Sequence, residues 1–90
     1  PTHLKIMKKT SAKISIVEDN EVVREGFSLL INSMDDFQVI SVFASCEDAI
    51  RNLDKNTPDI LLMDIDLPGM NGIEGTRRIK KSIPSIDIVA

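Results

Sequence analysis

Residues 59–73 read DILLMDIDLPGMNGI and carry the clearest structural signals of the chain. After its first residue, the run to Met63 is continuously apolar, which predicts a short strand buried on both faces. Asp64 follows this strand directly. The Pro-Gly pair at 68–69 predicts a loop, and Asn71 is a favourable N-cap for the helix predicted after it. The stretch therefore combines a buried strand, an acidic residue at the carboxyl end of that strand, and a capped helix.

The rest of the chain repeats this alternation of short apolar runs and amphipathic segments. Each amphipathic segment follows a polar residue that is suited to capping a helix. The predicted strands are 13–17, 37–43, 59–63 and 86–90, and the predicted helices are 21–34, 46–53 and 72–82, capped by Asn20, Ser45 and Asn71. Strands that alternate with helices indicate a parallel sheet covered by helices, so the sequence predicts an α/β fold.

Acidic side chains follow two of the predicted strands without a gap. Glu18 and Asp19 come directly after the first strand, and Asp64 comes directly after the third. If these strands are neighbours, their carboxyl ends meet at one edge of the sheet. Three carboxylates there repel one another, by about 4 kcal/mol per pair at 4 Å with an effective dielectric constant of about 20. A hard divalent cation offsets this repulsion, so the sequence predicts a Mg²⁺ site in which Asp64 also acts as a nucleophile toward phosphorus.

The charge of the chain argues against binding of nucleic acid. Its net charge is −3 over 90 residues. Three of the 11 basic residues lie in residues 1–12, which contain no acid, so residues 13–90 hold 8 basic and 14 acidic residues, a balance of −6. An acidic domain repels nucleic acid. Residues 1–12 are expected to form a leader or tail, and 13–90 the domain.

Other features of the composition indicate a compartment. No apolar run approaches the length that spans a membrane, so no membrane contact is expected. Cys46 is the single cysteine and cannot form an internal disulfide, which favours a reducing cytoplasm. Cys46 begins a predicted helix without a base or a second thiol near it in the sequence, so we expect it to pack in the core.

Two segments of the chain resemble a known family. Residues 16–20, IVEDN, and the VREGF segment at 23–27 resemble the opening of a response-regulator receiver domain. Residues 59–73 resemble the phosphorylation segment of the same family, and the resemblance extends from about Lys13 to Ala90. It implies a flavodoxin-like, doubly wound parallel sheet with strand order 2-1-3-4. The fifth strand and last two helices of the family would be missing from this incomplete domain.

The resemblance also implies roles for individual residues. Asp64 corresponds to the phosphorylated aspartate, and Glu18 and Asp19 to the acidic pair that binds Mg²⁺. Asp66 stands where the family donates a backbone carbonyl to the metal. The family also uses a Ser or Thr and a Lys that would lie beyond Ala90, so no residue here takes those roles.

The same resemblance implies partners. The phosphoryl donor would be a sensor histidine kinase or a histidine phosphotransfer protein, and a transcriptional output domain that binds DNA would lie outside these residues. The domain would be a phosphoacceptor with intrinsic self-dephosphorylation rather than an enzyme. Val22, Gly26 and Leu29 form an extra apolar stripe on the first helix, which either joins the core or docks the histidine-bearing partner. The apolar run at 86–90 would form a sheet edge, so we expect self-association, as a homodimer.

Two alternatives remain open at this point. The Asp64-Ile65-Asp66 spacing also fits the opening of haloacid-dehalogenase-like phosphatases, although Pro68 stands where those proteins have Thr or Val. Alternatively, the chain is an interaction module that keeps the acidic pocket without being phosphorylated. Phosphorylation of Asp64 that depends on Glu18 and Asp19 would exclude both.

Overall fold

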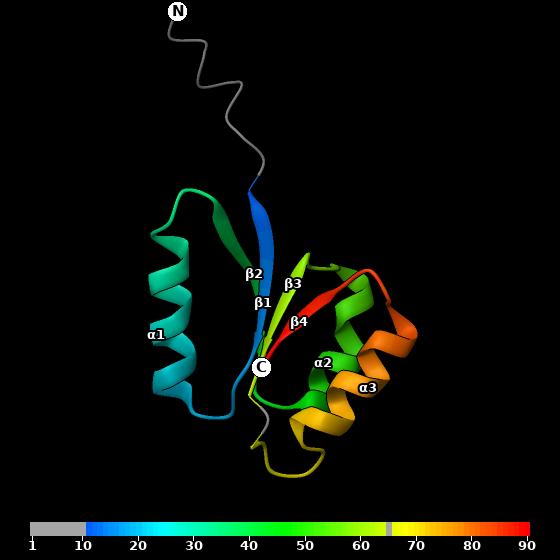
Figure 1. Cartoon of the computed structure of the whole chain (residues 1–90). Coiled ribbons are helices and arrows are strands. Elements are labelled where there is room, and N and C mark those ends of the chain that lie inside the picture. Colours follow the sequence, from blue (N-terminus) through cyan, green and yellow to red (C-terminus); the bar gives the residue numbers. More distant parts are fainter. Residues whose placement is uncertain (1–10, 65) are drawn as a thin grey trace, which may run out of the picture.

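The computed structural model describes residues 11–64 and 66–90, which form four strands and three α-helices in strict alternation (Figure 1). The elements are β1 (Ala12–Val17), α1 (Glu21–Asn32), β2 (Phe37–Phe43), α2 (Cys46–Asn52), the 3₁₀ turn η2 (Leu53–Lys55), β3 (Ile60–Met63), α3 (Gly72–Ser82) and β4 (Asp87–Val89). All strand pairs are parallel, and the order across the sheet is β2-β1-β3-β4. The predicted α/β class and strand order are confirmed. Residues 1–10 of the expected leader lie outside the described residues.

The three predicted helix caps are present. The Asn20 side chain accepts a hydrogen bond from the Val23 N–H at 3.0 Å. Ser45 does the same for Asp48 at 3.1 Å, and Asn71 for Glu74 at 3.0 Å. Each cap satisfies a backbone donor that the first turn of a helix leaves free, which is why these residues begin the helices.

The end of α1 differs from the prediction. The helix ends at Asn32 rather than at Met34, because two polar side chains close its last turn. The Ser33 hydroxyl donates to the Leu30 carbonyl at 2.6 Å, and the Asn32 side chain accepts from the Val39 N–H of β2 at 2.8 Å. Local hydrogen bonds of this kind compete with helix continuation.

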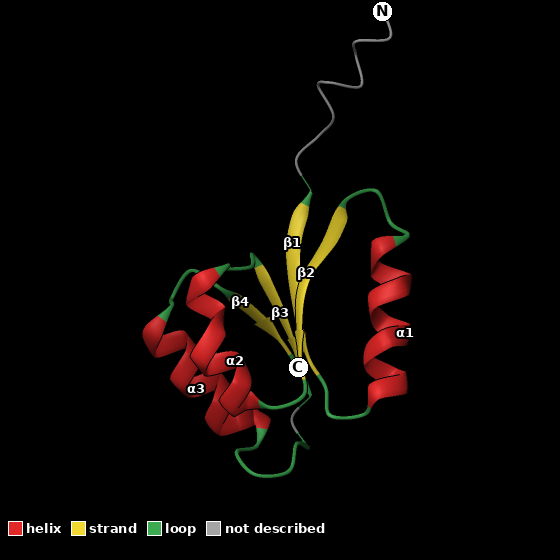
Figure 2. Cartoon of the chain, turned by 180° about the vertical axis from the view of Figure 1, so that it is seen from behind, coloured by secondary structure: helices red, strands yellow, loops and turns green. Residues whose placement is uncertain are grey.

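One face of the sheet is closed by α2 and α3 (Figure 2). The buried side chains of this face form one core, which comprises Val17, Cys46, Ala49, Leu53, Leu61, Met63, Leu67, Ile79 and Ile86. Cys46 is fully buried at the start of α2, as expected, and burial raises the pKa of its thiol. A Cβ on Gly75 would overlap Cys46 Sγ, so the close approach of α3 to α2 requires a glycine there.

Among the described helices, α1 is the one that lies on the opposite face of the sheet (Figures 1 and 2). In α1, whose residues are all described, no side chain is buried. Val22 is 80 % exposed and Leu29 is 75 % exposed, so the extra apolar stripe lies at the surface and is not part of the core. A groove of about 240 Å³ between α1 and the sheet is lined by apolar side chains, among them Ile31 and Leu62.

The pairing of β1 with β2 is interrupted once. Ile14 pairs with Val39 and the next residue, Ser15, pairs with Ser41, so Ile40 has no partner in β1. This bulge places the Ser15 and Ser41 hydroxyl oxygens 2.6 Å apart, which satisfies the fully buried Ser15 hydroxyl.

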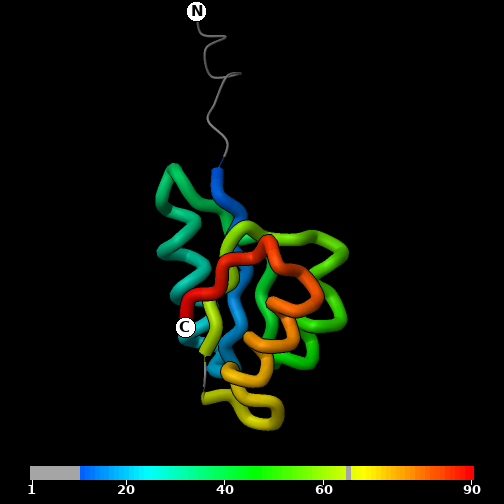
Figure 3. Tube along the Cα trace, turned by 45° about the vertical axis from the view of Figure 1, so that its right-hand side comes forward, coloured from blue at the N-terminus to red at the C-terminus, as the bar shows by residue number. Residues whose placement is uncertain are grey.

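The last residue, Ala90, lies on the α1 side of the sheet near its carboxyl edge (Figure 3). β4 is an edge strand of the described sheet. Among the described residues, no helix has the length and apolar character to cross a membrane.

Candidate functional site

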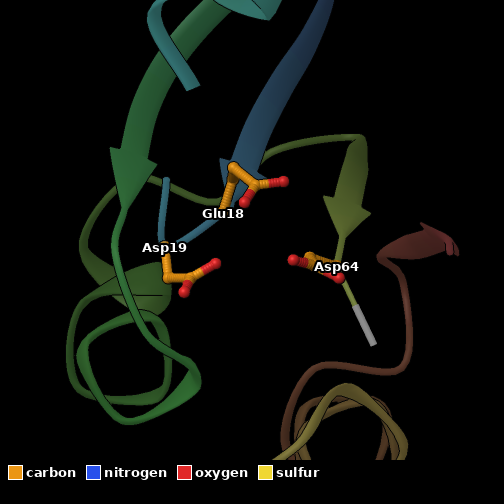
Figure 4. Close-up of side chains that lie close together, drawn as sticks. All are labelled: Glu18, Asp19 and Asp64. Atoms are coloured by element: carbon orange, nitrogen blue, oxygen red, sulfur yellow. The ribbon is translucent and has the colours of Figure 1, made fainter. Parts of the chain in front are cut away.

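Three carboxylates gather at the carboxyl edge of the sheet, where β1 and β3 end (Figure 4). Glu18, Asp19 and Asp64 each offer one oxygen, and these three atoms lie within 4.8 Å of one another. In Figure 4 the Asp19 and Asp64 side chains point toward each other, with Glu18 beside them. The predicted meeting of the three acids at one edge is therefore observed.

The sheet itself brings Glu18 and Asp64 together. Val17 and Met63 are the last paired residues of β1 and β3. Beyond that pair, the Asp64 N–H still donates to the Val17 carbonyl at 3.0 Å. On the other side of β1, the Glu18 N–H donates to the Phe43 carbonyl of β2 at 3.0 Å. Hydrogen bonds of the sheet therefore fix the backbone of both Glu18 and Asp64.

The loop from β1 to α1 is held by its own polar groups. The Glu18 carboxylate accepts a hydrogen bond from the Asn20 N–H at 3.1 Å. The Glu18 carbonyl accepts one from the Arg24 guanidinium at 2.8 Å. The second contact was not predicted, because nothing in the sequence signals that a side chain six residues on reaches back to the loop.

Burial and neighbouring charge both disfavour the ionised form of Glu18. Burial raises the pKa of the Glu18 carboxyl, and the charges of Asp64 and Asp19 raise it further, while the Asn20 N–H lowers it. A group whose ionised form is disfavoured in this way gains most from a bound cation.

The spacing of the acids suits a small hard cation. Octahedral Mg²⁺, with oxygens at about 2.1 Å, places its ligand atoms about 3–4 Å apart. The three carboxylate oxygens lie within 4.8 Å of one another, so they are close enough that all three could contact one such ion. The set contains only oxygen donors, which Mg²⁺ prefers.

The loop after β3 supports the Asp64 side chain. The Asp66 N–H donates to Asp64 Oδ1 at 2.9 Å, and Asp66 itself is exposed. The metal contact through the Asp66 carbonyl stays a prediction, and the contact from the Asp66 N–H to Asp64 was not predicted. An oxygen held by a backbone donor fixes the orientation of the whole carboxylate.

Further along, the same loop is tied to α2. Gly69 has φ +74°, a backbone conformation that favours glycine. This conformation explains why a glycine follows Pro68 in the predicted loop. The Glu47 carboxylate accepts from the Met70 N–H at 3.2 Å, and a Cβ on Gly69 would lie 3.0 Å from a Glu47 carboxylate oxygen. Leu67, between the site and this contact, is buried in the core.

A cavity of about 360 Å³ opens beside the acids on the α1 side of the sheet. Glu18 and Asp64 line its polar end, and Phe27, Val89 and Ala90 line its apolar part. Asp64 is therefore reachable from outside the sheet rather than enclosed by it.

Comparison with known families gives one match over nearly the whole described chain. The family model described as "Response regulator receiver domain" matches residues 14–90. Among curated proteins, the response regulator GacA of Pseudomonas syringae pv. syringae is 35 % identical over 78 residues, which cover 87 % of this chain and 36 % of GacA. The response regulator protein VraR of Staphylococcus epidermidis is 39 % identical over 77 residues, which cover 86 % of this chain and 37 % of VraR. The chain thus spans little more than a third of these relatives.

Solved structures agree in fold. A LuxR-family two-component response regulator from Aurantimonas sp. SI85-9A1 superposes with a TM-score of 0.82 at 38 % identity, over 88 % of this chain and 56 % of that one. The response regulator domain of Thermotoga maritima CheB gives 0.80 at 26 % identity, over 88 % of this chain and 60 % of that one.

Proposed function

Because this chain belongs to the response regulator receiver domain family, we propose that Asp64 accepts a phosphoryl group in a Mg²⁺ site that it shares with Glu18 and Asp19. The chain is then the signal-receiving part of a two-component system, in keeping with the response regulators that it resembles. The observation that carries this proposal is the convergence of three carboxylate oxygens within 4.8 Å at the ends of β1 and β3.

In the proposed reaction, an Asp64 carboxylate oxygen attacks the phosphorus of the donor. Oδ1 already accepts the Asp66 N–H, which favours Oδ2 as the attacking atom. An O–P bond forms at Asp64, the bond from phosphorus to the donor histidine breaks, and the histidine nitrogen keeps the electron pair. Mg²⁺ held by Glu18, Asp19, Asp64 and the Asp66 carbonyl would neutralise charge on the phosphoryl oxygens. Water later attacks the phosphorus, the O–P bond to Asp64 breaks, and inorganic phosphate leaves, which returns Asp64 to its free carboxylate.

The donor is proposed to be a sensor histidine kinase or a histidine phosphotransfer protein. The exposed side chains Val22 and Leu29 give α1 an apolar surface close to the acids, since α1 begins two residues after Asp19. A surface of this kind suits a protein partner that must bring its histidine to Asp64.

The output is proposed to be transcriptional and to lie outside these 90 residues. A relative of known structure from Staphylococcus aureus is described as a DNA-binding response regulator of the LuxR family, and this chain covers 64 % of it at 27 % identity. With 8 basic and 14 acidic residues in 13–90, the receiver itself is expected not to bind nucleic acid. We place the domain in the cytoplasm, where its one free thiol stays reduced.

The segment itself is proposed to be a phosphoacceptor rather than an enzyme. Two relatives are named protein-glutamate methylesterase/protein-glutamine glutaminase, and this chain covers 22 % of each. The family match favours a receiver over a haloacid-dehalogenase-like phosphatase. An interaction module that never becomes phosphorylated is the alternative that experiment must exclude.

Treatment of a longer chain that continues past Ala90 with acetyl phosphate and Mg²⁺, followed by intact-mass and peptide mass spectrometry, tests the proposal; the 90-residue chain is expected to react poorly. We expect one phosphoryl adduct on Asp64, no adduct after chelation of Mg²⁺, and none in Asp64→Asn. Asp54→Asn is the matched control, because Asp54 is exposed in η2 and makes no contact with the site. An adduct that persists in Asp64→Asn would overturn the assignment. Mg²⁺ binding without any adduct would favour the interaction module.

A further inference from the structure

The guanidinium of Arg24 contacts the backbone of the metal site rather than its carboxylates. Its Nη1 donates to the Glu18 carbonyl at 2.8 Å in a partly buried position. The Glu18 N–H is bound to β2 through Phe43, but Glu18 lies one residue past the end of β1. Past the end of β1, this carbonyl accepts its hydrogen bond from the Arg24 side chain and not from a strand.

The orientation of the Glu18 carbonyl influences where the Glu18 and Asp19 side chains point. The peptide unit between Glu18 and Asp19 is planar, so its carbonyl, its N–H and both flanking Cα atoms move together. A donor that holds the Glu18 carbonyl thus restricts ψ of Glu18 and φ of Asp19 at once. The Glu18 and Asp19 side chains start from the two Cα atoms at the ends of this planar peptide unit, so fixing the plane restricts both.

Arg24 is itself held by the structured start of α1. Its N–H donates to the Asn20 carbonyl at 2.9 Å, and its carbonyl accepts from the Ser28 hydroxyl at 3.0 Å. The guanidinium stays protonated at any working pH and presents several donors in a fixed plane. The Arg24 side chain therefore restrains the loop from a backbone position that is itself fixed in α1.

We propose that Arg24 is a positioning residue for the metal site: its guanidinium fixes the Glu18–Asp19 peptide unit so that both carboxylates face Asp64. This inference rests on the proposed Mg²⁺ site. A competing role for Arg24 is purely electrostatic, because a positive charge near three carboxylates weakens the attraction of the site for a cation.

The two roles predict opposite effects on Mg²⁺ affinity when Arg24 loses its guanidinium. Arg24→Met keeps an apolar stem and removes the charge and every donor. If positioning dominates, Mg²⁺ affinity falls by about tenfold, the lower end of the losses seen when supporting contacts of a metal site are removed. If charge dominates, Mg²⁺ affinity rises.

Titration of the 90-residue chain with Mg²⁺ alone, followed by NMR, distinguishes them. We expect the loss in Arg24→Met, and an affinity within about twofold of the wild type in Arg24→Lys, which keeps a donor and the charge. Arg51→Met is the matched control, since Arg51 lies in the last turn of α2 and pairs at the surface with Asp48. That control should also stay within about twofold of the wild type.

A second measurement without metal keeps the test independent of phosphorylation. In Arg24→Met the order parameter of the Asp19 amide should fall from about 0.85 toward 0.6, with no change in the amides of α1. Unchanged or tighter Mg²⁺ binding in Arg24→Met, or an unchanged Asp19 order parameter, would overturn the role of Arg24. A wild-type chain that binds no Mg²⁺ would instead contradict the proposed metal site, and the order parameter alone would then decide whether Arg24 holds the loop.

Discussion

Replacing Gly75 with alanine should destabilise the domain although alanine is the better helix former. The new Cβ would overlap Cys46 Sγ and lie 3.1 Å from Cys46 Cβ. Cys46 has no free space to move into, because it is fully buried and its Sγ already lies 3.5 Å from Met63 Sδ. Overpacking of this kind costs about 1–3 kcal/mol, and the gain in helix propensity returns about 1 kcal/mol. The difference is a net loss of between about 0 and 2 kcal/mol in the free energy of unfolding, and the overlap with Cys46 Sγ places Gly75→Ala in the upper half of that range, at about 1–2 kcal/mol.

Urea unfolding followed by circular dichroism measures this loss, and a double-mutant cycle tests its cause. In Cys46→Ala the sulfur is absent, so adding Gly75→Ala should cost less there than in the wild type, by about 1 kcal/mol or more. Gly26→Ala is the control, since a Cβ at that position of α1 would meet no atom within 4 Å other than its chain neighbours and the backbone of its own helix. It should be neutral or stabilising. If Gly75→Ala is as stable as the wild type, or if its cost is the same with and without the sulfur, the packing argument is refuted.

Three other predictions concern the site, the surface and the edge of the sheet. Asp19→Asn should weaken Mg²⁺ binding by at least about tenfold, and more than Asp66→Asn, because Asp66 is expected to contribute its carbonyl; equal losses in a Mg²⁺ titration would overturn this ligand assignment. The Arg77 and Arg78 side chains lower the pKa of Glu74 from 4.5 to about 2. The stabilisation from Glu74 is therefore present above pH 4.5 and lost as the pH falls through about 2, and Glu74→Gln should flatten the pH dependence of urea unfolding in that window. The edge strand β4, with Val89 52 % exposed, should lead the 90-residue chain to self-associate in light scattering. A cooperatively unfolding monomer at high concentration would contradict that expectation.

What the sequence predicted correctly depends on local or strictly periodic signals. The caps Asn20, Ser45 and Asn71 each act over three residues, so the chain alone determines them. The meeting of Glu18 with Asp64 follows from parallel pairing, because acids that end neighbouring strands must share an edge. The strand order itself came from the family resemblance and not from the residues.

What the sequence did not predict depends on geometry in three dimensions. The bulge at Ile40 shifts the register of β2 against β1, and the apolar run at 37–43 carries no mark of it. The reach of Arg24 back to the Glu18 carbonyl depends on the angle at which α1 leaves the loop. The sequence left open whether the apolar stripe with Val22 and Leu29 joins the core; both side chains stay exposed, because α1 is the one described helix on its face of the sheet.

The position of the acids between a closed and an open face explains how one edge can be both rigid and accessible. On the α2–α3 side, Val17 and Met63 are buried directly before Glu18 and Asp64, so the backbone of both acids is fixed by the core. On the α1 side, the cavity beside Phe27 leaves Asp64 reachable. Transfer of a phosphoryl group to a carboxylate requires both properties, because it depends on positioned charge and on entry of a large donor.

It follows that Gly75→Ala should reduce stability with little effect on Mg²⁺ affinity in the folded fraction, whereas Arg24→Met should change that affinity with little effect on stability. If both variants changed stability and Mg²⁺ affinity in the same proportion, the core and the loop would form one cooperative unit. It would then be wrong that the core fixes the backbone while Arg24 orients the loop.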